Sequence, residues 1–128
     1  MLILASNSAT RKALLQQAGI DFSTASADLD ERALEAGAIA AGGDGRDVAL
    51  LLAQHKARAV AQRHPDAIVI GADQTLSLGS ELLHKPVDRA DAAAQLDHLR
   101  GKTHRLHAAV ALVRGNVVLW SDIQTAEL

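Results

Sequence analysis

Cysteine is absent from this sequence, which excludes disulfide bridges, cysteine-ligated zinc and thiol chemistry. Its absence fits a protein of the reducing cytoplasm, where we expect this chain to act. Aromatic residues make up only 2% of the chain, although hydrophobic residues reach 48%. The hydrophobic core must therefore be built from leucine, isoleucine, valine and alanine.

The sequence also lacks a large charge excess and a long apolar run. A formal net charge of -2 provides no basic field for binding nucleic acid polymers. The apolar run Met1–Leu4 has no basic residues before it and is far too short for a signal peptide or a membrane span. A chain of 128 residues is long enough for one domain with its own core. We therefore expect a single domain over residues 1–128, without a membrane or a nucleic acid polymer as partner.

The first segment has the pattern of a strand, a polar turn and a helix. The apolar run Leu2–Ala5 predicts a short buried strand. Ser8 is a good N-cap for a helix that ends before Gly19. We expect its apolar face to contain Leu14, Leu15 and Ala18. The free N–H groups at its start, with Arg11 nearby, can bind a phosphate or another anion. The alternative is that Ser8 only caps the helix.

Acidic residues gather between this helix and the next one. Asp28, Asp30 and Glu31 can hold a divalent cation through oxygen ligands. Alternatively, Asp30 is an N-cap and Glu31 lies in the first turn of a helix. The glycine-rich segment Gly37–Gly45 predicts a loose connection.

Residues Asp47–Arg63 give the clearest helical pattern in the sequence. The residues expected on its apolar face are Val48, Leu51, Leu52, His55 and Ala59. Lys56 lies at the edge of this face. Its aliphatic stem can therefore pack while its ammonium reaches a ligand, or it can simply extend to solvent.

The β-branched run Ile68–Ile70 predicts a strand buried on both faces and ending at Gly71. Asp73 then follows the strand directly. Open α/β sheets bind ligands at the carboxyl ends of their strands, and the small residues before Asp73 let a ligand approach the backbone. Asp73 is therefore a candidate site residue, with the capping of a turn as the alternative.

The remaining sequence predicts a helix at Asp88–Arg100 and a strand at Thr103–Val113. A turn then leads to a returning strand, Val117–Trp120. Lys85 precedes a proline, which disfavours helical geometry and places it in a strand or loop. The sequence contains no G-x-x-x-x-G-K-[ST], G-x-G-x-x-G or H-E-x-x-H motif.

Four segments, in order along the chain, resemble the signatures of the Maf family of nucleotide pyrophosphatases: Leu4–Leu15, Gly71–Gln74, His84–Pro86 and Leu99–His104. The resemblance implies an α/β fold with a mixed twisted sheet and flanking helices, like that of inosine triphosphate pyrophosphatases. It also implies a cytoplasmic enzyme that cleaves a nucleoside triphosphate to a monophosphate and pyrophosphate. The cofactor implied is a divalent metal cation, Mg²⁺ or Mn²⁺.

The resemblance assigns roles to individual positions of this sequence. Asp73 matches the catalytic proton acceptor, and Glu31 matches an acidic position that, with Asp73, is implied as a metal ligand. Which carboxylate is the base stays open. The substrate-binding positions implied are Ser8, Arg11, Lys56 and Lys85, and the specificity positions are Thr10 and Gln74.

The sequence departs from the family pattern at Ala9 and Thr10, where two subgroups have Pro-Arg or Pro-Trp. Those subgroups prefer dTTP and UTP, or a 7-methylated GTP, so we expect a roomier and less selective base pocket in this protein. Family members also continue beyond the position of Leu128, so we expect residues 1–128 to be the first two thirds of the domain. In such a chain Thr103–Val113 or Val117–Trp120 would be an exposed edge strand, so we expect a homodimer or else poor solubility.

Two further hypotheses remain open from the sequence. The chain can bind nucleotides without hydrolysing them, or it can regulate cell division, since the family is named after septum formation.

Overall fold

The computed structural model describes residues 1–128 and contains one six-stranded sheet and four helices. The strands are β1 (Leu2–Leu4), β2 (Ser23–Thr24), β3 (Ile68–Leu78), β4 (Glu81–Leu83), β5 (Arg105–Arg114) and β6 (Val117–Glu127). The helices are α1 (Ala9–Gln17), α2 (Glu31–Ala40), α3 (Gly45–Ala61) and α4 (Arg89–Leu99).

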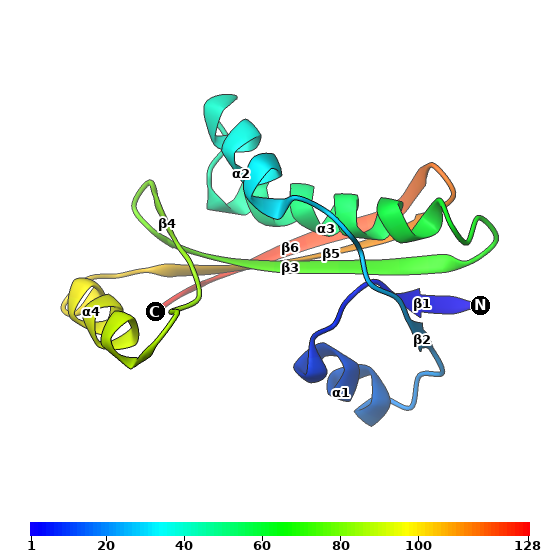
Figure 1. The fold of residues 1–128 in the computed structure, drawn as a ribbon, viewed down its shortest axis with the longest axis horizontal. Helices are drawn as coiled ribbons and strands as arrows, with labels where there is room; N and C mark the ends of the chain where they lie inside the picture. The colour runs from blue at the N-terminus through cyan, green and yellow to red at the C-terminus, as the bar shows by residue number, and fades with distance from the viewer.

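The sheet is mixed, as predicted, with the order β2-β1-β3-β5-β6 and with β4 paired to β3. Strand β1 runs parallel to β2 and β3, whereas β5 is antiparallel to both β3 and β6. Figure 1 shows α2 and α3 on one side of the sheet and α1 and α4 on the other. The predicted α/β class, with a mixed sheet and flanking helices, is confirmed.

Helix α3 forms most of the core by lying along β3 and β5 (Figure 1). Its fully buried residues are mainly small, as the shortage of aromatic residues led us to expect: Val48, Ala49, Ala53, Ala57, Val60 and Ala61. Across the interface, the sheet contributes Val69, Ala109, Ala111 and Val113, all nearly without exposed surface. The predicted apolar face of this helix was therefore correct at Val48 and Leu52, which are buried. Leu51 and Ala59 are only partly buried, and Ala49, Ala53 and Ala57 form the buried face instead.

The reason for this difference is the very close approach of α3 to β3 at Gly71. A Cβ atom added to Gly71 would lie 2.0 Å from the carbonyl oxygen of Ala53 and 2.9 Å from the Ala57 nitrogen. Only glycine on the strand and alanine on the helix allow backbones to come this close. The turn of α3 that follows Ala53 is therefore held directly above the middle of β3.

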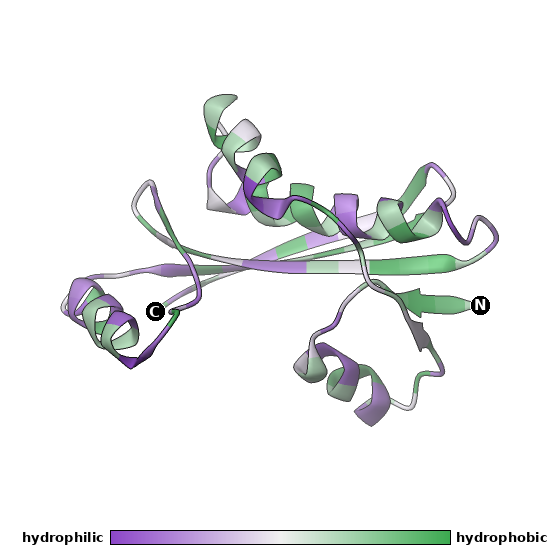
Figure 2. Ribbon diagram, viewed as in Figure 1, coloured by the Kyte–Doolittle hydropathy of each residue, from purple (hydrophilic) through white to green (hydrophobic).

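Strand β3 does not end at Gly71 as the sequence predicted, but continues to Leu78. Strand β5 pairs with it without interruption from Val69 to Ser77, and these hydrogen bonds outweigh the low strand propensity of glycine and aspartate. Figure 2 shows the hydrophobic start of β3 and the hydrophilic residues further along it. Asp73 thus lies within a strand rather than at its carboxyl end, and Ile68 and Ile70 are only partly buried.

Three further expectations need correction. The segment Gly37–Gly45 is not one loose connection, because α2 runs to Ala40 and α3 begins at Gly45. The last strand extends past Trp120 to Glu127, because it pairs with all of β5. Helix α1 has no buried residue and Leu14 is 60% exposed, so its apolar side contributes little to the core.

No helix combines the length and the apolar composition that crossing a membrane would require.

We predict that Gly71→Ala destabilises the protein by about 3 kcal/mol or more, because the added methyl group meets backbone atoms that cannot move without displacing α3. The urea unfolding midpoint measures this effect. Gly37→Ala in α2 is the matched control, because a Cβ atom added to Gly37 would have no contact within 4 Å. Alanine there should be neutral or stabilising by up to about 1 kcal/mol. Equal midpoints for Gly71→Ala and the wild type would contradict the close approach.

Candidate active site

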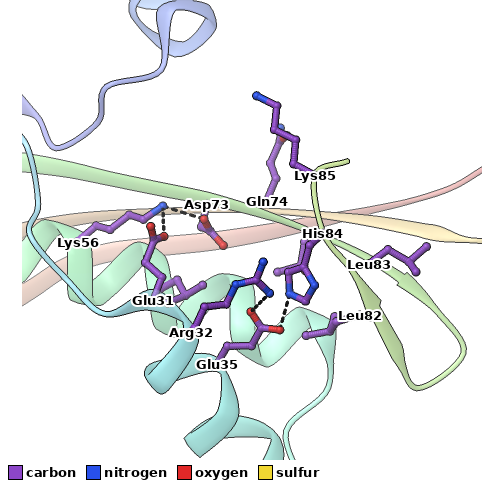
Figure 3. Close-up of a pocket in the computed structure, with 12 residues that line it drawn as sticks. Glu31, Arg32, Glu35, Lys56, Asp73, Gln74, Leu82, Leu83, His84 and Lys85 are labelled. Atoms are coloured by element: carbon purple, nitrogen blue, oxygen red, sulfur yellow. Dashed lines mark hydrogen bonds and ion pairs between the residues drawn. The ribbon is translucent and has the colours of Figure 1, made fainter. Parts of the chain in front are cut away.

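The candidate site is organised by a lysine that lies between two carboxylates. The Lys56 ammonium is 2.8 Å from Oδ1 of Asp73 and 2.9 Å from Oε1 of Glu31. It also approaches the carbonyl oxygen of Ala72 at 3.5 Å. Figure 3 shows the three charged side chains pointing toward one another from α2, α3 and β3. We call them the Glu31–Lys56–Asp73 cluster.

Local folding rules explain how three distant residues meet at this point. The contact at Gly71 holds α3 above β3, so Lys56 lies over the strand face to which Asp73 points. Asp30 caps α2 by accepting a hydrogen bond from the Ala33 amide at 3.0 Å, which places Glu31 in the first helical turn. The capping alternative for Asp30 is therefore correct, and it is compatible with Glu31 in the site.

Asp73 is the most buried member of the cluster, and its side chain is only 11% exposed. Burial raises the pKa of the Asp73 carboxyl above its ordinary value, while the hydrogen bond and the charge of Lys56 lower it and the charge of Glu31 raises it. The folded protein therefore holds this proton more tightly than the unfolded chain. That contribution to stability is complete below pH 3.8 and is lost as the pH rises through the raised pKa.

Two cavities meet at this cluster, and Glu31 and Lys56 line both of them. The larger cavity, of about 540 Å³, also contains Asp73, Gln74 and Lys85. The smaller one, of about 230 Å³, lies against the start of α1. The remaining residues of the smaller cavity are Ala5, Ser6, Asn7, Ser8, Arg11 and Ala27.

The start of α1 supplies an anion-binding environment to the smaller cavity. Ser8 caps the helix by accepting a hydrogen bond from the Arg11 amide at 3.3 Å. The Ser6 hydroxyl accepts hydrogen bonds from the Ser8 amide at 3.0 Å and from Arg11 Nη1 at 3.5 Å. The guanidinium and the positive end of the helix dipole therefore point to the same region.

The structure distributes the predicted site residues unequally. Ser8, Arg11, Glu31, Lys56 and Asp73 surround the junction of the two cavities. Gln74 and Lys85 also line the larger cavity, but their side chains extend to the opposite side of β3 from the cluster (Figure 3). Thr10 is exposed on the first turn of α1 and lines neither cavity.

Three titratable residues of the larger cavity were missed from the sequence: Arg32, Glu35 and His84. Glu35 Oε1 lies 2.7 Å from His84 Nε2, and its other oxygen lies 4.0 Å from Arg32. One signal for Glu35 was available, because it follows Glu31 by four residues and so lies on the same face of a helix. No local pattern connected His84 with it.

The chemistry of the cluster fits a divalent cation. Two carboxylates converge on one positive charge, and Mg²⁺ is commonly bound by one or two carboxylates together with phosphate oxygens. No group of three or more histidine, aspartate or glutamate residues forms a complete protein cage for a metal. Glu31 and Asp73 are the two carboxylates that would hold such a cation, together with oxygens of a phosphate ligand.

The fold and the site together define an α/β protein in which cationic groups and a helix N-terminus surround a buried carboxylate. The model of Maf-like proteins matches residues 1–128, and the chain belongs to this family.

Curated relatives are similar over nearly the whole chain. A protein of Brucella abortus biovar 1 (strain 9-941) named 7-methyl-GTP pyrophosphatase is 52% identical over 127 residues, covering 99% of this chain and 64% of its own length. A protein of Rhodopseudomonas palustris (strain HaA2) named nucleoside triphosphate pyrophosphatase is 49% identical over 128 residues, covering 99% of this chain and 62% of its own length. The chain thus spans less than two thirds of the length of these relatives.

Solved structures show the same fold at low identity. A HAM1 protein from Coxiella burnetii matches with a TM-score of 0.57 and 14% identity, over 98% of this chain and 69% of that one. A Mycobacterium abscessus protein described as a nucleoside-triphosphatase and dITP/XTP pyrophosphatase matches with a TM-score of 0.54 and 17% identity. This match covers 98% of this chain and 70% of that one. These likenesses confirm the predicted resemblance of the fold to that of inosine triphosphate pyrophosphatases.

We predict that Lys56→Met raises the pKa of Asp73 further, because the lysine hydrogen bond and charge are the largest influences that lower it. Glu31→Gln should instead lower the pKa of Asp73, since the Glu31 charge is among the causes that raise it. A ¹³C NMR titration of the side-chain carboxyl groups measures both shifts. The two opposite directions control for each other, and a shift of the same sign in both variants would contradict the geometry of the cluster.

Proposed function

We propose that this protein hydrolyses nucleoside triphosphates to a nucleoside monophosphate and pyrophosphate. The observation that supports this most is the Glu31–Lys56–Asp73 cluster at the junction of two cavities, one of which contains Arg11 and the start of α1. A triphosphate is polyanionic, and this junction offers it cations and N–H donors beside a buried carboxylate. The names of the curated relatives support the same reaction.

In this proposal the chain's residues bind and orient the phosphates. The Arg11 guanidinium and the amides at the start of α1 bind phosphate oxygens in the smaller cavity, and the Lys56 ammonium does so at the junction. Lys85 contributes a further positive charge from the larger cavity. Holding the reactants in line avoids much of the entropic cost of bringing them together.

A carboxylate of the cluster then accepts a proton from the attacking water. The water oxygen forms a bond to the α-phosphorus, the bond to the bridging oxygen breaks, and pyrophosphate leaves with the electron pair. Asp73 is the proposed base because it is the buried carboxylate of the cluster, and burial raises its pKa above that of an ordinary aspartate, which makes it a stronger proton acceptor. General bases of this kind contribute on the order of 10²–10⁴ in rate.

Glu31 and Asp73 are also the residues that would hold a divalent cation, Mg²⁺ or Mn²⁺. When bound, such a cation neutralises phosphate charge and makes the phosphorus more electrophilic.

We predict that Asp73→Asn lowers kcat by about 10²–10⁴ and leaves nucleotide binding largely intact, because the amide keeps the shape of the side chain but cannot accept the proton. Pyrophosphate release with Mg²⁺ or Mn²⁺ measures kcat, and calorimetry with a non-hydrolysable triphosphate measures binding. Asp66→Asn, on an exposed turn, is the matched control and should behave like the wild type. Near-normal turnover by Asp73→Asn would refute the assignment. Binding of nucleotides by the wild type without any turnover would instead favour a binding protein.

The base preference forms a separate prediction. The relatives include proteins named for 7-methyl-GTP and proteins named for nucleoside triphosphates in general. We propose that Gln74, which lines the larger cavity, sets the preference by offering both donors and an acceptor to a base, whereas Thr10 lies outside both cavities. Several triphosphates, 7-methyl-GTP among them, should then be hydrolysed with comparable kcat/KM in a panel of substrates. A preference above about 10⁴-fold for one base requires hydrogen bonds built around that base and would contradict this expectation.

A further inference from the structure

Helix α2 packs against α3 with Leu34 and Ala38 partly buried, and it reaches the larger cavity through charged side chains. None of its residues is fully buried. Its contacts with the rest of the site come from two carboxylates, Glu31 and Glu35, which are one helical turn apart on one face. Glu31 contacts Lys56 at 2.9 Å, and Glu35 contacts His84 at 2.7 Å. The same helix face therefore connects the carboxylate cluster with the loop that follows β4.

His84 is fixed from two directions. Its imidazole Nε2 meets Glu35 on α2, and its carbonyl oxygen accepts a hydrogen bond from Gln95 Nε2 on α4 at 2.9 Å. The next residue is Lys85, and Pro86 after it restricts the backbone further. The backbone from which the Lys85 side chain extends is therefore anchored between two helices.

The exposed fractions of the Glu35 and His84 side chains indicate that this pair belongs to the site rather than to the core. The Glu35 side chain is only 14% exposed, although it lies in a cavity wall and not in the core, and the His84 side chain is 41% exposed. A second histidine–glutamate pair serves as a comparison. His98 on α4 lies 2.8 Å from Glu81 on β4, with side-chain exposures of 43% and 53%, and neither residue lines the larger cavity.

We propose that the Glu35–His84 pair is a positioning device that holds Lys85, on the side of β3 opposite the cluster, where it binds a phosphate of a nucleotide that extends into the larger cavity. The inference rests on the proposed function. A lysine side chain loses considerable conformational entropy when it binds a phosphate. A fixed backbone lowers this cost, because fewer degrees of freedom remain to be ordered on binding. Glu35 and His84 thus act through Lys85 and do not touch the reacting atoms.

The first test compares His84→Ala and His84→Gln with the control His98→Ala. Loss of the imidazole should raise KM, and the Kd for a non-hydrolysable triphosphate, by about tenfold, which corresponds to about 1.4 kcal/mol. The value of kcat should change less than about twofold, because Lys85 binds substrate and transition state alike. Glutamine keeps an N–H donor for Glu35 and should restore most of the affinity, while His98→Ala should leave KM unchanged.

The second test is a double-mutant cycle with Lys85→Ala. Once Lys85 is removed, His84→Ala should have no further effect on KM or Kd, because the pair acts only through that lysine. Equal effects of His84→Ala in the presence and absence of Lys85 would overturn the proposal. So would equal effects of His84→Ala and His98→Ala, which would show a general loss of stability.

Amide hydrogen exchange of residues 83–87 separates the failure of this inference from that of the proposed function. Faster exchange in His84→Ala than in His98→Ala is expected whether or not nucleotide is present, and unchanged exchange would overturn the proposal. A wild-type protein that neither binds nor hydrolyses any triphosphate would overturn the proposed function, and with it the binding of phosphate by Lys85.

Discussion

The contact between the Lys56 ammonium and the Asp73 carboxylate, 2.8 Å apart and mostly buried, is the interaction on which the rest of the site depends. A buried charge without a partner is strongly unfavourable, so removing either side chain would leave the other charge unpaired inside the protein. Glu31 adds a second carboxylate to the same ammonium at 2.9 Å. Since these residues come from α3, β3 and α2, the cluster also fixes three elements relative to one another.

The cluster can form only because α3 lies unusually close to the sheet. A core with few aromatic residues leaves alanine and valine at most of the contact positions of α3. Gly71 then allows the helix backbone to approach the strand until a single Cβ atom would collide with it. The composition of the core and the geometry of the site are therefore connected. A bulkier interface would move Lys56 away from Asp73.

Helix α2 differs from α3 because it contributes to the site and hardly at all to the core. None of its residues is fully buried, and beside the partly buried Leu34 and Ala38 its inner face contacts the site through Glu31 and Glu35. Such polar contacts on a partly exposed surface contribute little to global stability. Their effect is geometric, since they place one wall of the larger cavity and connect it with the loop before Lys85.

The sequence by itself determined the class of fold, most helices and strands, and several of the caps, because these features depend on periodicity and on residues such as Ser8, Asp30 and Gly19 that act within one or two helical turns. The resemblance to the family also named Glu31, Lys56 and Asp73 as candidate site residues, and the structure brings these three side chains together. The tertiary structure alone decided that β3 continues through Asp73, because only pairing with β5 outweighs local propensity there. It alone joined Glu35 to His84, 49 residues away in the sequence. A contact of that kind leaves no periodic trace in the chain, since it depends on how α2 and β4 are placed around β3.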